Sequence, residues 1–232
     1  VGRSFALANI GATLAQWGYR VLCVDWDLEA PGLDQYFAQW IEPTSRGLID
    51  IVEACSQGRD PRWSSVVSPV RIEGLRGPLG VVTAGGRTAR NYATRVQDID
   101  WNRLYEKKAF GAFLERLREQ WKAAYDFVLI DSRTGISDVA GITSIHLPDL
   151  LAVVVTPNAQ SLSGVARVAA AAMQGRDQLP YLRAGLMVLP IVSRFELRVE
   201  YKVATEWLGR IESELGFLYR PWLPRSATVA DI

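Results

Sequence analysis

The sequence has little of the chemistry that builds disulfide-rich or zinc-binding proteins. Its two cysteines, Cys23 and Cys55, are too few for a disulfide framework, and a single histidine, His146, leaves little for a structural zinc site. No uninterrupted apolar run is long enough to cross a bilayer, and the opening residues do not resemble a secretory signal. These absences predict a globular protein of the reducing cytoplasm.

Neither sign of charge dominates the chain, which has 26 lysines and arginines against 25 aspartates and glutamates. A formal net charge of +1 gives no support for a DNA-binding surface, and no amphipathic C-terminal helix indicates membrane contact. Arg87, Arg90 and Arg95 form a local basic run. We interpret this run first as a solvated face, with binding to an anionic partner as the alternative.

What the chain does have is a regular alternation of strand-like and helical segments. The apolar pattern predicts strands at 21–24, 80–83, 127–130, 150–155 and 186–192. It predicts helices at 4–17, 110–121, 161–173 and 199–215. The apolar face of the first helix is expected to consist of Leu7, Ile10, Leu14 and Trp17. This order is typical of an α/β protein with a doubly wound, mainly parallel sheet and helices on both faces.

We predict a single domain over residues 1–232. Residues 42–76 contain several prolines, glycines and serines, and we expect an irregular insertion or cap beside the functional site there. Ligands of open α/β sheets bind beyond the carboxyl ends of the strands. The segments that follow the strands are therefore the place to look for chemistry.

The first candidate motif is Gly2-Arg3-Ser4, which opens the first helix. Backbone N–H groups and the helix dipole at a helix N-terminus attract phosphate, and a serine hydroxyl at this position is a ligand for magnesium. The alternative is that Ser4 is an ordinary residue of a first helical turn. Three residues alone do not decide between these interpretations.

The second motif places two aspartates at the end of a short apolar strand. Residues 21–24 read Val-Leu-Cys-Val, and Asp25 and Asp27 follow them, one residue apart. One carboxylate of such a pair would orient an attacking water beside a metal-bound phosphate, and the other would support the metal. The alternative is a turn with helix-capping aspartates.

The third motif has the same form. Residues 127–130 read Phe-Val-Leu-Ile and end at Asp131, and Gly135 lies four residues further along. An aspartate after an apolar strand is the Walker B pattern, whose carboxylate accepts from a magnesium-bound water. A glycine at position 135 lets the backbone approach a phosphate closely.

The three motifs together resemble the ParA/MinD family of deviant Walker P-loop ATPases. The stretch from Asp25 to Leu33 is the most specific part of the resemblance. Arg3 narrows it to the bacterial subgroup whose phosphate loop reads Lys-Gly-Gly-Val-Gly-Arg-Ser/Thr. Residues 149–164, 192–194 and 223–226 also resemble later segments of the family. The early lysine of the loop, which acts on the partner subunit, and the preceding strand are expected to lie outside the sequence.

The resemblance implies roles for five residues of the three motifs. Ser4 would be a magnesium ligand, and Arg3 would contact phosphate. Asp27 would orient the hydrolytic water. Asp25 would support the metal shell, and Asp131 would bind magnesium through water.

Further matched residues are implied to contact the nucleotide. Gly2 belongs to the phosphate loop, and Thr134 and Gly135 would lie near the γ-phosphate. The residues implied to line the base are Ser193, Arg194, Pro224 and Arg225.

The resemblance therefore implies a switch that binds ATP and Mg²⁺, dimerises around the nucleotide and acts on a protein partner. Arg3 keeps the charge of the usual lysine but has a larger, planar head, so we expect weak hydrolysis. One alternative is a non-hydrolysing, nucleotide-dependent interaction module in a signalling or defence assembly. Another is a tyrosine kinase of the bacterial type, although such kinases usually carry a tyrosine-rich tail that is not seen here.

Overall fold

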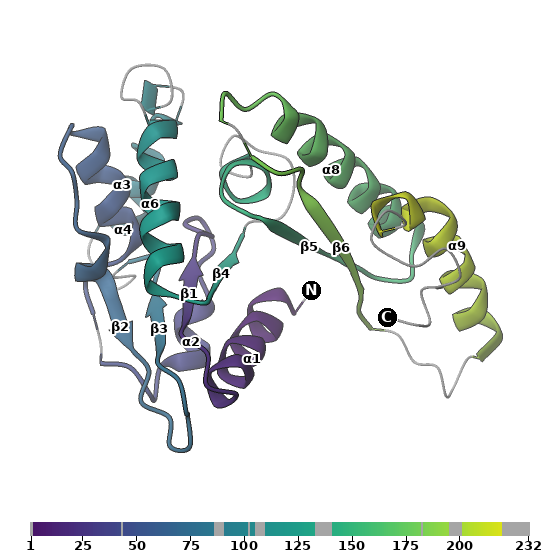
Figure 1. The fold of residues 1–232 in the computed structure, drawn as a ribbon, viewed down its shortest axis with the longest axis horizontal. Helices are drawn as coiled ribbons and strands as arrows, with labels where there is room; N and C mark the ends of the chain where they lie inside the picture. The colour runs from purple at the N-terminus through teal and green to yellow at the C-terminus, as the bar shows by residue number, and fades with distance from the viewer. Residues whose placement is uncertain are drawn as a thin grey trace. The chain divides into compact units, whose positions relative to one another are not determined.

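The chain forms two compact units, Gly2–Thr143 and a second unit that begins at Ser144 (Figure 1). The computed structural model describes all residues except 1, 43, 86–90, 102, 105–109, 133–140, 182, 195–200 and 220–232. In the described residues the strands form two sheets, one of four strands and one of two.

The first unit is built on the four-stranded sheet, whose order is β2-β3-β1-β4. Its strands are β1 (Val21–Asp25), β2 (Val67–Pro69), β3 (Leu79–Val82) and β4 (Phe127–Asp131). Strand β1 runs parallel to both β3 and β4, and β2 pairs antiparallel with β3. All five residues of β1 are buried, as expected of a strand inside a sheet that is covered on both faces.

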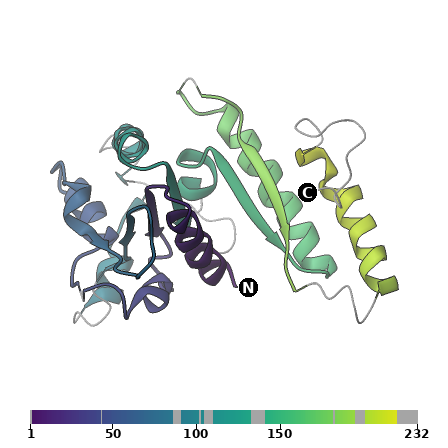
Figure 2. The same ribbon diagram turned by 60° about the horizontal axis from the view of Figure 1, so that its bottom comes forward.

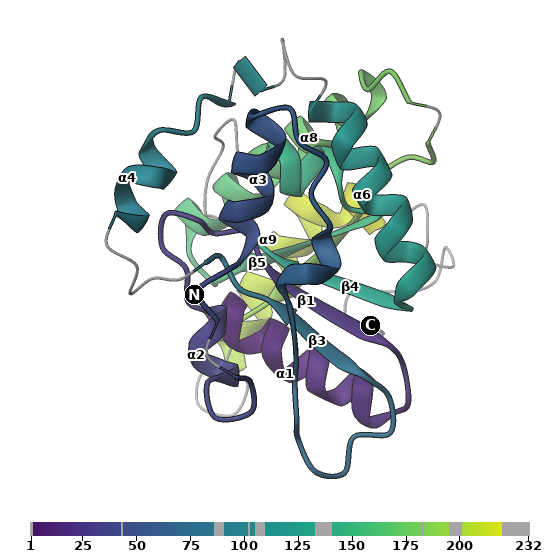
Figure 3. The same cartoon turned by 90° about the vertical axis from the view of Figure 1, so that its left-hand side faces the viewer.

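Helices cover both faces of this sheet. Helix α1 (Arg3–Gln16) packs on one face, and α6 (Phe110–Ala124) packs on the opposite face (Figure 3). Other helices that the structure describes in this unit are α2 (Leu33–Phe37), α3 (Leu48–Ser56), the 3-10 turn η1 (Trp63–Val66) and α4 (Tyr92–Gln97).

Small residues bring α1 close to the sheet. Its buried residues are Ala8, Gly11 and Ala15, and a Cβ on Gly11 would lie 2.6 Å from the Sγ of Cys23. Of the larger residues that the sequence predicts for this face, Leu7 and Leu14 are partly buried against the core, whereas Ile10 is 45% exposed and Trp17 is 67% exposed. The prediction is wrong for Ile10 and Trp17, because small residues permit a closer approach of the helix than large ones.

The second unit has a parallel pair of strands, β5 (Leu150–Val155) and β6 (Met187–Val192). Helix α8 (Ala159–Asp177) runs alongside these strands (Figure 2), and α9 (Tyr201–Tyr219) packs against β6 and α8. A π-helical turn, η2 (Ile142–His146), precedes β5 in the chain. The core of this unit contains Val155, Leu162, Ala169, Val188, Ile211 and Leu215.

The α/β class and the mainly parallel strands are confirmed, and all five predicted strands are present within one or two residues of their expected bounds. Residues 42–76 are more regular than expected. They contain α3, η1 and β2, and most residues of α3 are buried. The proline, glycine and serine content hid a nine-residue helix whose apolar side chains face the core. The single-domain prediction and the function of residues 42–76 as a cap stay predictions.

No helix in the described part of the chain is long and apolar enough to span a bilayer.

Cys23 is expected to be unreactive in the folded protein. It is fully buried in β1, and burial raises the pKa of its thiol to about 12, so the reactive thiolate is scarce at neutral pH. In a Cys55→Ala variant, a chromogenic disulfide reagent at pH 8 should label Cys23 only after denaturant is added. Rapid stoichiometric labelling under native conditions would contradict the burial of this strand.

Candidate functional site

The N-terminus of α1 has the geometry of an anion-binding site. Gly2 adopts a left-handed conformation, φ 82° and ψ 14°, which favours glycine. The first helical hydrogen bond runs from the N–H of Ala6 to the carbonyl oxygen of Gly2 at 2.9 Å. The N–H groups of residues 3–5 therefore precede the helical ladder, and no acidic residue lies in the first turn to satisfy them. Together with the helix dipole, they can hold a phosphate.

Arg3 is anchored to the backbone at the end of β4. Its Nη2 donates to the carbonyl oxygen of Ser132, just after β4, at 3.1 Å. Its Nε is buried and has no hydrogen-bond partner within the described residues. A buried guanidinium N–H without an acceptor costs free energy, so an anionic oxygen at this place would stabilise the site.

Ser4 and Asp131 are joined at the same edge of the sheet. The Ser4 hydroxyl donates a hydrogen bond to the Asp131 carboxylate. Asp131 is only 4% exposed, and burial raises the pKa of its carboxyl above the usual range, while the Ser4 hydrogen bond and the charge of Arg3 oppose that rise. The charge of Asp27 also raises the pKa of Asp131, which indicates that the two carboxylates lie near one another.

Asp25 holds the loop that follows β1. Its Oδ2 accepts from the N–H groups of Gly32 at 3.1 Å and Leu33 at 3.0 Å, and its Oδ1 accepts from the N–H of Asp27 at 3.2 Å. Burial raises the pKa of Asp25 to about 7, and the nearby charge of Asp131 adds to the rise, against these backbone hydrogen bonds. Both carboxylate oxygens thus organise residues 26–33 up to the start of α2, as the alternative interpretation of a turn with helix-capping aspartates describes.

Asp27 is the less constrained of the two aspartates. Its side chain is half-buried, and Oδ1 accepts from the N–H of Ala30 at 3.1 Å. The flanking Trp26 and Leu28 are 1% and 3% exposed, and the Trp26 ring lies edge-on to Trp121 of α6, with ring centroids 6.4 Å apart. The apolar neighbours fix the backbone and leave the Asp27 carboxylate at the site.

The structure thus brings together the predicted site residues of the first unit, which are Gly2, Arg3, Ser4, Asp25, Asp27 and Asp131. Four predicted residues lie outside the described residues: Thr134, Gly135, Pro224 and Arg225. Ser193 and Arg194 belong to the second unit. Ser193 donates its N–H to Val155 at 2.8 Å, and Arg194 is exposed with a φ of 56°.

The donor set fits a magnesium ion bound together with phosphate. No cluster of three or more His, Cys, Asp or Glu side chains suited to a metal ion occurs among the described residues. Magnesium keeps several waters and takes one or two protein ligands plus phosphate oxygens, so such a cluster is not needed. The Ser4 hydroxyl and the Asp131 carboxylate are ligands of the right chemistry, with Asp25 beside them.

Arg95 does not form the solvated face that the sequence predicts. Its guanidinium binds Glu53 of α3 at 2.7 Å and Asp50 at 3.0 Å, and its side chain is 25% exposed. The prediction is wrong for Arg95 because its partners lie more than forty residues away. Arg87 and Arg90 lie outside the described residues.

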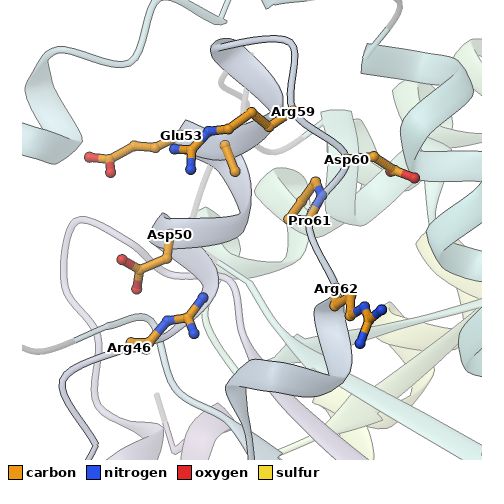
Figure 4. Close-up of a pocket in the computed structure, with 8 residues that line it drawn as sticks. Arg46, Asp50, Glu53, Arg59, Asp60, Pro61 and Arg62 are labelled. Atoms are coloured by element: carbon orange, nitrogen blue, oxygen red, sulfur yellow. The ribbon is translucent and has the colours of Figure 1, made fainter.

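A hollow of about 270 Å³ lies elsewhere on the first unit (Figure 4). Its charged lining residues are Arg46, Asp50, Glu53, Arg59, Asp60 and Arg62. None of the predicted site residues lines it, and Asp50 and Glu53 already pair with Arg95. The strand-end site is therefore not this hollow.

A comparison with family models finds no match. A septum site-determining protein MinD of Oltmannsiellopsis viridis is 28% identical to the chain over 173 residues, which are 73% of this chain. The match covers 46% of that relative, so the chain spans about half of its length.

Solved structures share the fold at lower identity. MinD of Pyrococcus horikoshii in complex with Mg-ADP is 19% identical, with a TM-score of 0.61 over 89% of this chain and 72% of that one. The Cyanothece McdA–ATP complex is 13% identical, with a TM-score of 0.67 over 94% and 75%. A plasmid partition protein of Borrelia burgdorferi is 18% identical, with a TM-score of 0.61 over 90% and 80%. The strand-end motifs and the 28% identity to MinD support a relationship to the ParA/MinD-type P-loop ATPases, and the solved structures show that the chain shares their fold.

Proposed function

We propose that the chain is a switch that binds ATP with Mg²⁺, hydrolyses it weakly and dimerises around the nucleotide to regulate or position a protein partner. The observation that carries the proposal is the convergence of Arg3, Ser4 and Asp131 at the open N-terminus of α1, with Asp27 beside them. Support comes from the solved relatives that hold Mg-ADP and ATP. We propose a cytoplasmic location because ATP is abundant there.

Each residue has a defined task in this proposal. The N–H groups of the first turn of α1, with Gly2 before them, hold phosphate oxygens. Ser4 and Asp131 would hold Mg²⁺, with Asp25 supporting the shell, and a metal bound there would supply positive charge beside the phosphates. Asp27 orients the attacking water and accepts a hydrogen bond from it. Arg3 stabilises negative charge on the phosphates from a position fixed by Ser132.

The anchoring of Arg3 supports the expectation of slow hydrolysis. One of its terminal nitrogens is occupied by the Ser132 carbonyl oxygen, which leaves a guanidinium that is less free to follow the phosphate than a lysine ammonium. The same observation favours the second candidate function, a nucleotide-locked interaction module that binds ATP without hydrolysing it.

We propose that further residues contact the γ-phosphate and the base of the nucleotide. Thr134 and Gly135 would lie near the γ-phosphate, and Ser193, Arg194, Pro224 and Arg225 would line the base. A partner to be positioned is suggested by the names of the relatives, which include septum site-determining and plasmid partition proteins. The narrower subgroup inferred from Arg3 stays a prediction.

A Ser4→Ala variant tests the metal and phosphate site. Removing the hydroxyl takes away a magnesium ligand, so ATP affinity in the presence of Mg²⁺ should fall about tenfold or more, with little change in EDTA. Calorimetric titration with ATP measures both conditions. Ser163→Ala, which removes an exposed hydroxyl on α8, is the matched control and should bind as the wild type does. Equal Mg²⁺-dependent affinity in Ser4→Ala would remove Ser4 from the site.

Turnover and oligomeric state decide between the two candidate functions. A chain that hydrolyses ATP and dimerises only with ATP acts as a cycling switch. A chain that binds ATP without releasing phosphate is the nucleotide-locked module. Phosphate release and light scattering, followed in the same samples, separate the two, and absence of ATP binding would overturn both.

A further inference from the structure

We infer that Tyr92 is a positioning residue for Asp27, the carboxylate to which the proposed function assigns the attacking water; the inference rests on that function. Tyr92 is the first residue of α4, and its hydroxyl donates to the carbonyl oxygen of Leu28 at 2.8 Å. Leu28 directly follows Asp27. The hydrogen bond therefore holds the backbone on the C-terminal side of Asp27.

The backbone on both sides of Asp27 is held by its neighbours. Before it, the N–H of Trp26 donates to the carbonyl oxygen of Asp131 at 2.9 Å, which ties the loop to β4. Across it, the N–H of Leu28 donates to the carbonyl oxygen of Trp26 at 3.0 Å and closes a tight turn with Asp27 at its centre. Tyr92 is the contact from outside the loop that fixes the far end of this turn.

A glycine gives Tyr92 access to the loop. Gly85 follows β3 with a φ of 146°, and a Cβ there would lie 3.3 Å from the Tyr92 ring and 2.7 Å from the Cγ2 of Ile49. The Tyr92 ring thus lies against the segment that follows β3 while its hydroxyl reaches the segment that follows β1. One side chain links two strand ends of the sheet.

Helix α4 needs an anchor of its own, because six residues do not form a stable helix in isolation. Arg95 supplies it by binding Glu53 and Asp50, and Figure 4 shows both carboxylates on the same side of α3. The guanidinium makes two hydrogen bonds to Glu53, a geometry that fixes orientation as well as distance. Arg95 thus fixes α4 on α3, and Tyr92 of the same helix fixes the turn at Asp27.

The substitution Tyr92→Phe removes one oxygen atom and keeps the ring. We expect the kcat for ATP hydrolysis to fall about tenfold while the ATP dissociation constant stays within about twofold, because the turn at Asp27 loosens and the phosphate site does not. Tyr36→Phe is the matched control, since Tyr36 is 41% exposed and packs its ring on Phe5. It should leave both quantities unchanged. A parallel loss of kcat and ATP affinity in Tyr92→Phe would overturn the positioning function.

Hydrogen exchange tests the same contact without nucleotide. Amides of residues 26–30 should exchange about tenfold faster in Tyr92→Phe than in the wild type, and Arg95→Met should act in the same direction. The double variant should add little to either single change, because both act through one contact chain. Unchanged exchange in Tyr92→Phe would overturn the inference. A wild-type chain that binds no ATP would overturn the proposed function instead, and the exchange data would still decide on Tyr92.

Discussion

Asp27→Ala should lower ATP turnover at least about 100-fold while the affinity for ATP stays within about threefold of the wild type. Orientation of the attacking water contributes mainly to the transition state, so its loss appears in kcat. The phosphate contacts come from other residues, the first turn of α1 and Arg3, and they remain in the variant. Single-turnover phosphate release gives the rate of hydrolysis, and ATP titration of the same preparation gives the affinity.

The fold of the Asp27→Ala variant should survive. Asp27 is half-buried, and among the described residues its carboxylate accepts only the N–H of Ala30 at 3.1 Å, while Asp25 carries the rest of the loop. Asp27→Asn keeps the shape and removes the charge, and it should lose turnover in the same direction. Glu29→Ala, an exposed carboxylate in the same loop, is the control and should keep its turnover. Full activity in Asp27→Ala would refute the assignment of the water to Asp27.

Gly47→Ala should lower the free energy of unfolding by about 3 kcal/mol or more. A Cβ on Gly47 would lie 2.5 Å from the nitrogen and 2.6 Å from the Cα of Gly85, and it would also overlap the carbonyl oxygen of Thr83. All of these atoms belong to the backbone, so no side chain can turn aside. The clash falls where Leu48 donates its N–H to Thr83 at 2.8 Å, and so the attachment of α3 to the end of β3 would be lost.

Urea denaturation measures the free energy of unfolding of Gly47→Ala and of a control, Gly32→Ala, in the same unit. No atom lies within 4 Å of an ideal Cβ on Gly32, so the added methyl group meets no neighbour. Gly32→Ala should therefore stay within about 0.5 kcal/mol of the wild type. A Gly47→Ala variant with an unchanged denaturation midpoint would show that α3 is not attached to β3 in this way.

Sequence patterns predicted the parts of this protein that depend on neighbours along the chain. The buried strands β1 and β4 are visible as short apolar runs, and each ends in an aspartate at the site. The contact of Tyr92 with Leu28 spans 64 positions and ends on a backbone carbonyl, which carries no signature in the sequence. The partners of Arg95 were hidden for the same reason, and α3 was hidden among residues typical of loops.

The pairing of β1 with β4 ties together two motifs that are 106 residues apart. Asp25 lies opposite Asp131 in this parallel register, and the side chains of a strand alternate between its faces. Inserting or deleting a single residue within either strand would turn one aspartate to the other face of the sheet and separate the pair. Insertions in the loops between the two strands leave this register untouched, because they only lengthen a connection. The chemistry of the site is therefore sensitive to the length of two five-residue segments and tolerant of the length of the loops between them.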